Sequence, residues 1–516
     1  MAMNGKALSS FYPVTSTFLP DYLFCPRVEK LPQKIRSTPE LLKTLPFLDE
    51  LAEIELRVHL LHQAPPPLPD NIEVWQLRPG VELLEASWSG LVELLNGADT
   101  SPFRQNSFVL VIPGEGDKPP SVTVPDKRCL LALKIVVEEL DLLRTARECK
   151  TSVRHLQDIL LYATQKGILL HPKSKIVRPK HFSLNSKVDS RFLSAEVFTL
   201  QWHITQNCDL RCLHCYDRSD RQDVSLKQGR NILDQLYDFC KQQNVLGQVS
   251  FSGGNPILHP DFYNLYQEAA ERGFMIGILG NPIGRQQLER LLSIHPPEFY
   301  QVSLEGLEKH NDSIRGSGHF NRTMHFLSLL KDLDIYSMVM LTLTQANLEQ
   351  VLPLAEMLND SADLFTFNRL AMVGEGASLV SVSPKDYENF LKAYLEAAKT
   401  HPVMRLKDNL FNILKLHQGS ELGGGCAGHG CGAAFNFISL LSDGEVHACR
   451  KLPSLIGNIY KNTLAEIYQD DIALRYRQGC RGCLHCEIKP VCGGCPAVTN
   501  GFGGNFSADV DPYCFL

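Results

Sequence analysis

The chain has 516 residues, 44% of them hydrophobic, and a formal net charge of −6 at pH 7. That length exceeds one ordinary hydrophobic core, so we expect two to four domains. The acidic balance gives no reason to expect nucleic acid as a partner, because proteins that follow a phosphate backbone usually carry a basic excess. The sequence contains no uncharged apolar run of about 18 residues and no apolar secretory segment near its start, so we expect no membrane partner and a cytoplasmic location.

The sixteen cysteines favour metal ligation over disulfide bonds, because the cytosol keeps thiols reduced. Eleven of them fall in two clusters, and the others are scattered or marginal: Cys25, Cys129, Cys149, Cys240 and Cys480. We therefore look for metal chemistry in the two clusters.

The N-terminal part divides at a proline-rich stretch. Residues 1–64 form a helical segment with one helix expected over 38–61, and "APPPLPD" then ends the helical pattern, since proline cannot continue a helix. In residues 65–172, two short runs within 71–87 are hinged on Pro79-Gly80 in the manner of a hairpin.

Helical periodicity follows over 125–141 and 152–170. A strand pair followed by short helices resembles a winged-helix fold, and a generic helical N-terminal domain is the alternative. The lysine-rich, largely unpatterned residues 173–195 are typical of a linker.

The region 196–400 alternates strand-like and helix-like segments, which predicts an α/β fold with parallel strands, either doubly wound or barrel-like. Helix 225–243 begins with a capping box of Ser225 and Gln228, and helix 261–273 ends at Gly273. The six predicted strands are 198–204, 247–251, 274–279, 298–304, 336–344 and 364–370.

A cysteine triad follows the first predicted strand: Cys208, Cys212 and Cys215. In a parallel α/β fold the active site gathers at the carboxyl ends of the strands, where this loop lies. Three thiolates so spaced can bind three corners of an iron–sulfur cluster and leave the fourth iron open. The alternative is a zinc site completed by His214 or His203.

The triad resembles the signature of the radical S-adenosylmethionine (SAM) superfamily. The resemblance implies a partial (β/α)6 TIM-like barrel and a 4Fe-4S cluster whose open iron chelates SAM. Reduction by a partner such as flavodoxin or ferredoxin then releases a 5′-deoxyadenosyl radical that abstracts hydrogen from the substrate.

The same resemblance implies contacts to the SAM cofactor. Gly253-Gly254 is similar to the start of the family's Gly-Gly-Glu motif, with Asn255 in place of the glutamate. Ser303 and Glu305 correspond to the pair that holds the ribose hydroxyls, and Arg315 to the partner of the cofactor carboxylate. Further candidates are His214, Asn281 and Arg369, while Thr344 and Asn347 occupy comparable strand ends. Each of these residues could instead be an ordinary surface residue.

A second cysteine cluster begins in the glycine-rich residues 423–432, a composition that lets the backbone fold around an inorganic core. A zinc ribbon, the alternative here, needs four ligands and leaves four cysteines unexplained. The arrangement of residues 401–516 resembles the SPASM domain, which carries two auxiliary 4Fe-4S clusters. That resemblance assigns one auxiliary cluster to Cys426, Cys431, Cys449 and Cys495 and the other to Cys483, Cys486, Cys492 and Cys514, giving three clusters in all.

Two features of this region depart from the family pattern. Two residues separate Cys492 from Cys495, where the usual pattern has three. Cys480 fits no ligand position, so it is an alternative ligand, a catalytic thiol or a spare cysteine.

The combined resemblance implies a radical SAM maturase that oxidatively modifies, by crosslinking, a ribosomally synthesised precursor peptide. The Gly-Gly-Asn variant and "NRLAMVGEG" are similar to maturases of the selenobiotic type, and residues 65–172 resemble the element that binds the peptide leader. The alternatives are an anaerobic sulfatase-maturating enzyme that forms formylglycine, and a non-catalytic iron–sulfur electron carrier or zinc-binding module.

Overall fold

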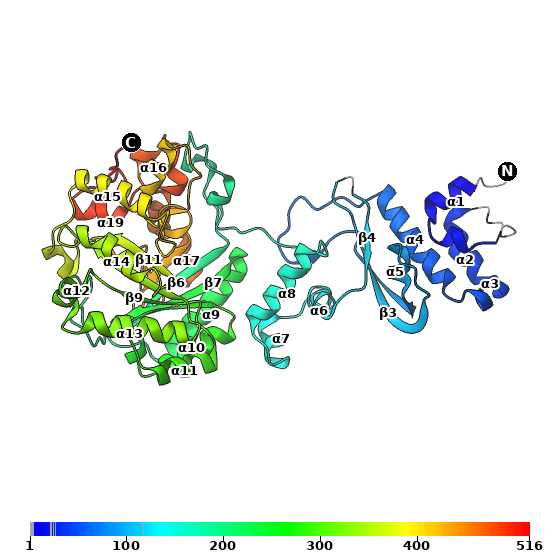
Figure 1. Ribbon diagram of the computed structural model, residues 1–516, viewed down its shortest axis with the longest axis horizontal. Coiled ribbons are helices and arrows are strands. Elements are labelled where there is room, and N and C mark those ends of the chain that lie inside the picture. Colours follow the sequence, from blue (N-terminus) through cyan, green and yellow to red (C-terminus); the bar gives the residue numbers. More distant parts are fainter. Residues whose placement is uncertain (1–4, 21–22, 24, 26, 117) are drawn as a thin grey trace. The chain divides into compact units, whose positions relative to one another are not determined.

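The computed structural model describes residues 5–20, 23, 25, 27–116 and 118–516. The chain divides into two compact units, Met1–Lys173 and Ser174–Leu516 (Figure 1). Each unit has a buried apolar core of its own. No helix within the described ranges is long and apolar enough to cross a membrane.

The first unit begins with helices that share a core with a sheet. The expected single helix over 38–61 is wrong: it is broken between Thr44 and Leu48, because Pro46 lacks an amide hydrogen and disfavours helical backbone at Leu45. Buried residues of the helices pack with sheet residues such as Ala86 and Val109. The helices are α1 (Gly5–Phe11), α2 (Leu31–Arg36), α3 (Pro39–Thr44) and α4 (Leu48–Gln63).

The expected hairpin over 71–87 is also wrong. Its first run, β1 (Gln76–Leu77), pairs with β5 (Leu169–Leu170), and its second run, β2 (Glu82–Ser89), pairs with the longer β3 (Phe103–Ile112). The tight turn at Pro79-Gly80 exists, but it redirects the chain between two sheets. Sheet β2-β3-β4 is antiparallel, with β4 (Ser121–Thr123) at its edge.

Helices follow this sheet, as the periodicity predicted. Asp126 caps the helix Lys127–Val137 and Ser152 caps the helix Val153–Gln165 through their side chains. The winged-helix interpretation stays a prediction. The helices after the sheet are α6 (Lys127–Val137), α7 (Leu142–Glu148) and α8 (Val153–Gln165), whereas the short α5 (Leu91–Leu95) lies between β2 and β3.

The residues expected to form a linker, 173–195, belong almost wholly to the second unit and are held there. Buried Arg178 donates to the carbonyl oxygens of Arg477 and Cys431, both at 2.6 Å, and Ser183 donates to that of Cys486 at 3.1 Å. This segment therefore packs on the C-terminal region.

The second unit is built on a parallel sheet whose six predicted strands are all confirmed. They pair in chain order, each parallel to the next, which gives the arc of a partial barrel rather than a doubly wound sheet. The strands are β6 (Val197–Thr205), β7 (Leu246–Gly253), β8 (Met275–Leu279), β9 (Phe299–Ser303), β10 (Ser337–Leu343) and β11 (Leu364–Arg369).

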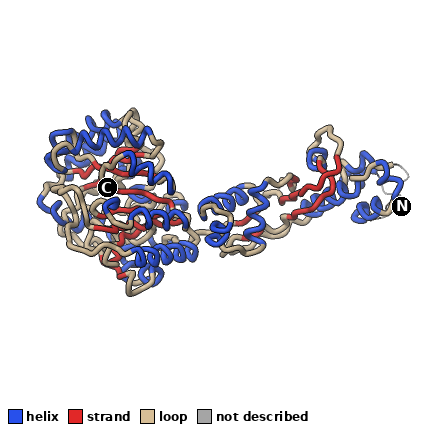
Figure 2. Tube along the Cα trace, turned by 90° about the horizontal axis from the view of Figure 1, so that it is seen from below, coloured by secondary structure: helices blue, strands red, loops and turns tan. Residues whose placement is uncertain are grey.

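Helices connect these strands and pack against the sheet (Figures 1 and 2). The capping box of Ser225 and Gln228 is confirmed, and Gly273 follows the helix end with a φ of +76°. The helices of this region are α9 (Leu226–Gln243), α10 (Phe262–Glu271), α11 (Arg285–Ile294), α12 (Glu308–Arg315), α13 (His319–Asp332), α14 (Val351–Leu358) and α15 (Pro384–Ala397).

Alternation along the strands separates a core face from a polar face. In β6, Leu200 and Trp202 are fully buried in the apolar core, whereas Gln201 and His203 line a cavity. Polar side chains of neighbouring strands, such as Ser250 in β7, line the same cavity. The inner face of the arc is therefore the floor of a site.

The C-terminal region extends the same sheet, which the sequence did not predict. Strand β12 (Phe437–Leu440) pairs in parallel with β6, and β13 (Glu445–His447) and β14 (Leu455–Asn458) continue antiparallel. The remaining helices are α16 (Phe411–His417), α17 (Leu464–Gln469), α18 (Asp471–Gln478) and α19 (Pro496–Gly501). This region and the barrel share one core.

Candidate active site

The cysteine triad lies on the loop after β6 and faces a cavity of about 890 Å³. Cys208, Cys212 and Cys215 all line it. Burial raises the pKa of the Cys212 and Cys215 thiols, so a metal must displace their protons when it binds.

Two donors point at these sulfurs. The Asn281 amide nitrogen lies 3.6 Å from Cys208 Sγ, and Arg315 Nη1 lies 3.7 Å from Cys212 Sγ. Amide and guanidinium donors stabilise thiolate ligands of iron–sulfur clusters. The donor set and its surroundings therefore fit a cluster, and Cys208, Cys212 and Cys215 are the residues that would hold it.

Glu305 lies behind Arg315, outside the cavity lining. Its Oε1 is 2.6 Å from Arg315 Nη2 and 3.2 Å from His214 Nε2, and its Oε2 accepts from the Thr342 amide at 2.8 Å. Burial would raise its pKa, but the charges of His214 and Arg315 outweigh burial and hold the pKa well below its usual range. Both oxygens are thus engaged within the protein, and Glu305 positions Arg315. The contact of Glu305 with the cofactor ribose stays a prediction. Ser303 does line the cavity.

Gly253 and Gly254 line the cavity, and close packing explains why both positions are glycine. A Cβ on Gly253, whose φ is +131°, would lie 2.1 Å from the Thr205 carbonyl oxygen, and one on Gly254 would lie 2.2 Å from that of Asn207. The Gly254 amide donates to Thr205 at 2.9 Å. The glycines let the loop after β7 press against the loop that carries the triad.

Asn255 lies outside the cavity lining and lines a smaller pocket of about 370 Å³. Its amide nitrogen donates to Asp209 Oδ1 at 3.0 Å, and Asn281 donates to the same oxygen at 2.6 Å. Its own Oδ1 is buried without a partner. Asn255 therefore braces the triad loop through Asp209, and its contact with a cofactor stays a prediction.

Three other predicted residues have structural partners. Arg369 lines the cavity, but its guanidinium forms ion pairs with Asp408 at 2.9 Å and Asp511 at 2.8 Å. Asn347 accepts from the Thr344 amide at 2.8 Å and donates to the carbonyl oxygen of Glu305 at 2.9 Å. These residues hold strand ends in place.

The structure brings one C-terminal cysteine set to the same cavity as the triad: Cys426, Cys431, Cys449 and Cys495. The other set lies outside this cavity lining. Burial raises the pKa of the Cys483 thiol, and the nearby Cys480, Cys486 and Cys514 raise it further. Burial also raises the pKa of Cys492, to which Cys486 contributes. Cys480 stands with this second set and not in the cavity. It is buried, and its thiol donates to the Asp509 carbonyl at 2.9 Å.

Two buried asparagines connect the cysteine loops through hydrogen bonds. Asn409 accepts from the Cys426 amide at 2.7 Å and donates to the Gly494 carbonyl at 2.8 Å. Asn412 bonds both the amide and the carbonyl of Gly423 and the carbonyl of Val491. The sequence analysis missed both residues. Two asparagines three positions apart beside an apolar helix start could have indicated buried side chains that hydrogen-bond to the backbone.

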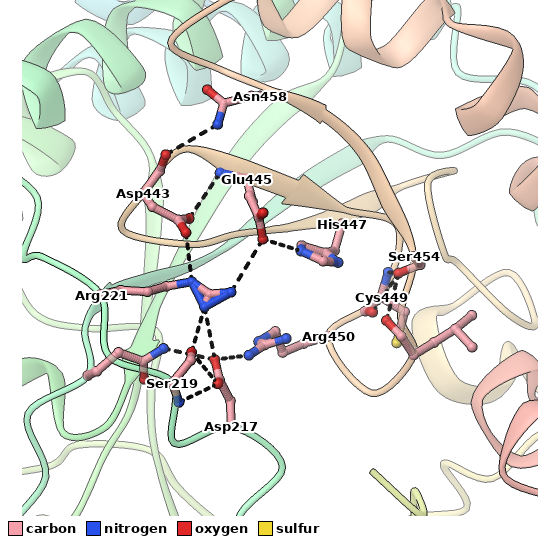
Figure 3. Close-up of polar contacts among 12 residues, drawn as sticks. Asp217, Ser219, Arg221, Asp443, Glu445, His447, Cys449, Arg450, Ser454 and Asn458 are labelled. Atoms are coloured by element: carbon pink, nitrogen blue, oxygen red, sulfur yellow. Dashed lines mark hydrogen bonds and ion pairs between the residues drawn. The ribbon is translucent and has the colours of Figure 1, made fainter. Parts of the chain in front are cut away.

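An ion-pair network joins the triad loop to the loop of Cys449 (Figure 3). Asp217, two residues after Cys215, pairs with Arg450, the residue after Cys449. Arg221 bridges onward to Asp443 at 2.8 Å and Glu445 at 3.3 Å. Sequence reasoning missed this network because its partners lie more than two hundred residues apart.

His203 lies on the floor beside this network. Burial, followed by the charge of Arg450, lowers its pKa to about 3, so the ring is neutral. Across the described ranges, no three His, Cys, Asp or Glu side chains converge closely enough for a single metal ion.

Comparisons with known proteins match both regions. The Radical SAM superfamily model matches residues 202–358, and the SPASM model, an iron–sulfur cluster-binding domain, matches residues 431–496. The chain is 27% identical over 341 residues to the AdoMet-dependent heme synthase of Methanosarcina barkeri, covering 61% of this chain and 95% of that protein. It is 25% identical over 338 residues to the mycofactocin maturase MftC of Mycobacterium tuberculosis, covering 61% and 82%.

Among solved structures, SuiB of Streptococcus suis bound to its precursor peptide SuiA is similar in fold. The TM-score is 0.51 at 17% identity, and the alignment covers 80% of this chain and 97% of that chain. The triad lies inside one matched region and most C-terminal cysteines lie inside the other, so this chain carries a radical SAM domain followed by an iron–sulfur cluster-binding SPASM domain.

Proposed function

We propose that this protein oxidatively modifies a ribosomally made precursor peptide, by forming a crosslink within it. The observation that carries the proposal is the shared cavity: the triad and the set of Cys426, Cys431, Cys449 and Cys495 line one space. An oxidative radical reaction needs a site that generates the radical and a site that takes up the surplus electron, both within reach of one substrate.

We assign three 4Fe-4S clusters, one to the triad and one to each C-terminal set. When bound, the reduced triad cluster and SAM supply a hydrogen-abstracting radical, and the C-terminal clusters supply an electron sink. A flavodoxin or ferredoxin is the proposed external redox partner. The chain's own part is to orient: Arg315, fixed by Glu305, presents a guanidinium that suits a cofactor carboxylate.

The first unit is the proposed leader-binding element. SuiB, whose solved complex contains a precursor peptide, aligns with 80% of this chain, more than residues 174–516 alone comprise. The alignment therefore extends into the first unit, which supports the proposal that SuiB has a counterpart of part of this unit.

Anaerobic reconstitution followed by iron and SAM-cleavage assays tests the cofactor assignment. We expect about twelve irons per chain and release of 5′-deoxyadenosine with dithionite and SAM. Replacing Cys208, Cys212 and Cys215 with alanine should abolish cleavage and leave about eight irons. Zinc with little iron would contradict the assignment, and surviving cleavage would show that the triad is misassigned.

Peptides encoded by small reading frames beside the gene test the substrate. The expected product has lost two hydrogens and carries a new internal bond, seen by tandem mass spectrometry. A trapped aldehyde would instead favour formylglycine formation.

A second candidate is tetrapyrrole chemistry, because the alignment covers 95% of the Methanosarcina barkeri heme synthase. Heme formation from an iron porphyrin by the reconstituted protein, without any peptide, would favour it. The proposal predicts none.

A further inference from the structure

The segment 174–195 places a buried cation beside the first C-terminal cysteine set. Arg178 is 5% exposed and donates to the carbonyl oxygens of Cys431 and Arg477. Its guanidinium also lies 4.1 Å from the ring centroids of Phe182 and Phe435. No carboxylate in the described part of the chain forms an ion pair with it.

A second buried cation stands beside the other cysteine set. Lys489, between Cys486 and Cys492 in the chain, is 3% exposed, and its Nζ lies 4.4 Å from the centroid of the Phe182 ring. Among the residues that the structure describes, none offers it a carboxylate ion pair either. Phe182 therefore contacts two buried cations, one at each set.

Buried charges in proteins are normally paired, because taking an unpaired charge out of water is costly. Carbonyls and ring faces satisfy part of the Arg178 guanidinium, but its Nε stays buried without a partner. The negative charge within reach of each cation is the neighbouring thiolate set, which becomes permanently charged only when it binds a cluster.

We infer that Arg178 and Lys489 are tuning residues of the two C-terminal clusters: each supplies a positive charge that raises the reduction potential of its own cluster. The reason is that a reduced cluster carries one more negative charge than an oxidised one, so a nearby cation stabilises the reduced form. Raised potentials make both clusters better electron acceptors, which an oxidative reaction requires. The inference rests on the proposed function.

The test is a redox titration of the reconstituted full chain, followed by electron paramagnetic resonance. A Cys208→Ala, Cys212→Ala, Cys215→Ala background removes the signal of the triad cluster. In that background, Arg178→Gln should shift the potential of one C-terminal cluster to a lower value, and Lys489→Met should shift the other. Arg178→Lys keeps the positive charge, so its cluster should have a reduction potential closer to that of the parent protein.

Lys187→Met is the matched control, because Lys187 lies on the same segment and pairs with Glu487, but its side chain is 79% exposed. Its removal should move neither potential, since water and salt screen an exposed charge.

Unchanged potentials in both neutral variants at full iron content would overturn the inference and leave Arg178 and Lys489 as packing residues. If Arg178→Gln loses iron, Lys489→Met and Arg178→Lys decide the outcome. A parent protein with no iron at the C-terminal sets would instead overturn the proposed function.

Discussion

At the scale of single residues, Glu305 shows how the site fixes a charge before any ligand arrives. One carboxylate holds Arg315, His214 and the Thr342 amide, so the guanidinium is oriented in advance. The sequence singled out Glu305 but did not predict its pairing with Arg315 and His214, because a strand-end position does not reveal which side chains face each other.

We expect Glu305→Gln to lower the free energy of unfolding by about 3 to 5 kcal/mol at neutral pH, since it leaves Arg315 buried without a carboxylate. The folded pKa of Glu305 lies below its usual value of 4.5, so the stabilisation is complete above that pH and is lost as the pH falls toward the folded pKa. The gap between wild type and variant should therefore shrink in acid.

Urea denaturation of the cluster-free protein across a pH series measures this gap. Glu375→Gln is the control, because its half-exposed carboxylate lies 3.8 Å from Arg218. This substitution should change the free energy of unfolding little. A gap that stays constant through acid pH would contradict the assigned pairing.

The ion pair of Asp217 and Arg450, whose side chains are only 10% and 12% exposed, allows a double-mutant cycle. Asp217→Asn and Arg450→Met should each destabilise the protein, by about 3 kcal/mol for a broken buried pair. The double variant should cost less than the two effects added, with a coupling of about 1 to 3 kcal/mol. Urea denaturation of the wild type, the two single variants and the double variant measures these free energies of unfolding.

Arg475→Met, at an exposed arginine of α18, is the control for that cycle and should be nearly neutral. Full additivity of Asp217→Asn and Arg450→Met would mean that the two loops are held together by other contacts.

At the scale of elements, the six parallel strands were predictable because each is a compact apolar or alternating run between helices with clear ends. The pairing of the strands in the first unit was not predictable, and neither were β12 to β14. Their runs are short or half polar, and their partners are fixed by long-range packing that no local pattern encodes. The cysteines of the site were likewise predictable from spacing and resemblance, whereas their buried polar supports were not.

Asn409, just before α16, is such a support. Asn409→Leu keeps the side-chain size but loses the bonds to the Cys426 amide and the Gly494 carbonyl. We expect the reconstituted variant to lose about four irons and to keep SAM cleavage at the triad. Iron analysis with a 5′-deoxyadenosine assay measures both.

Asn462→Leu, at an exposed asparagine of the same region, should retain every iron. Full iron content in Asn409→Leu would show that the cysteine loops hold their positions without the asparagine.

At the scale of the whole molecule, the two units carry separate cores, so their tasks can be separated. A chain reduced to residues 174–516 should still bind its clusters and cleave SAM, because every cysteine of the three sets lies within it. It should lose most of its affinity for a precursor peptide if the first unit holds the leader.

Fluorescence anisotropy with a labelled precursor peptide, run beside the cleavage assay, checks this expectation. Undiminished peptide affinity in the shortened chain would assign leader binding to the second unit.

The pairing of β12 with β6 has a consequence for how the molecule can be cut. Strand β6 would be the open edge of the barrel sheet without β12, and an open edge exposes unpaired amide and carbonyl groups to other chains. A barrel ended before residue 437 would therefore be prone to self-association through β6. The C-terminal region, besides carrying the cysteine sets, therefore covers the β6 edge and protects the barrel from self-association.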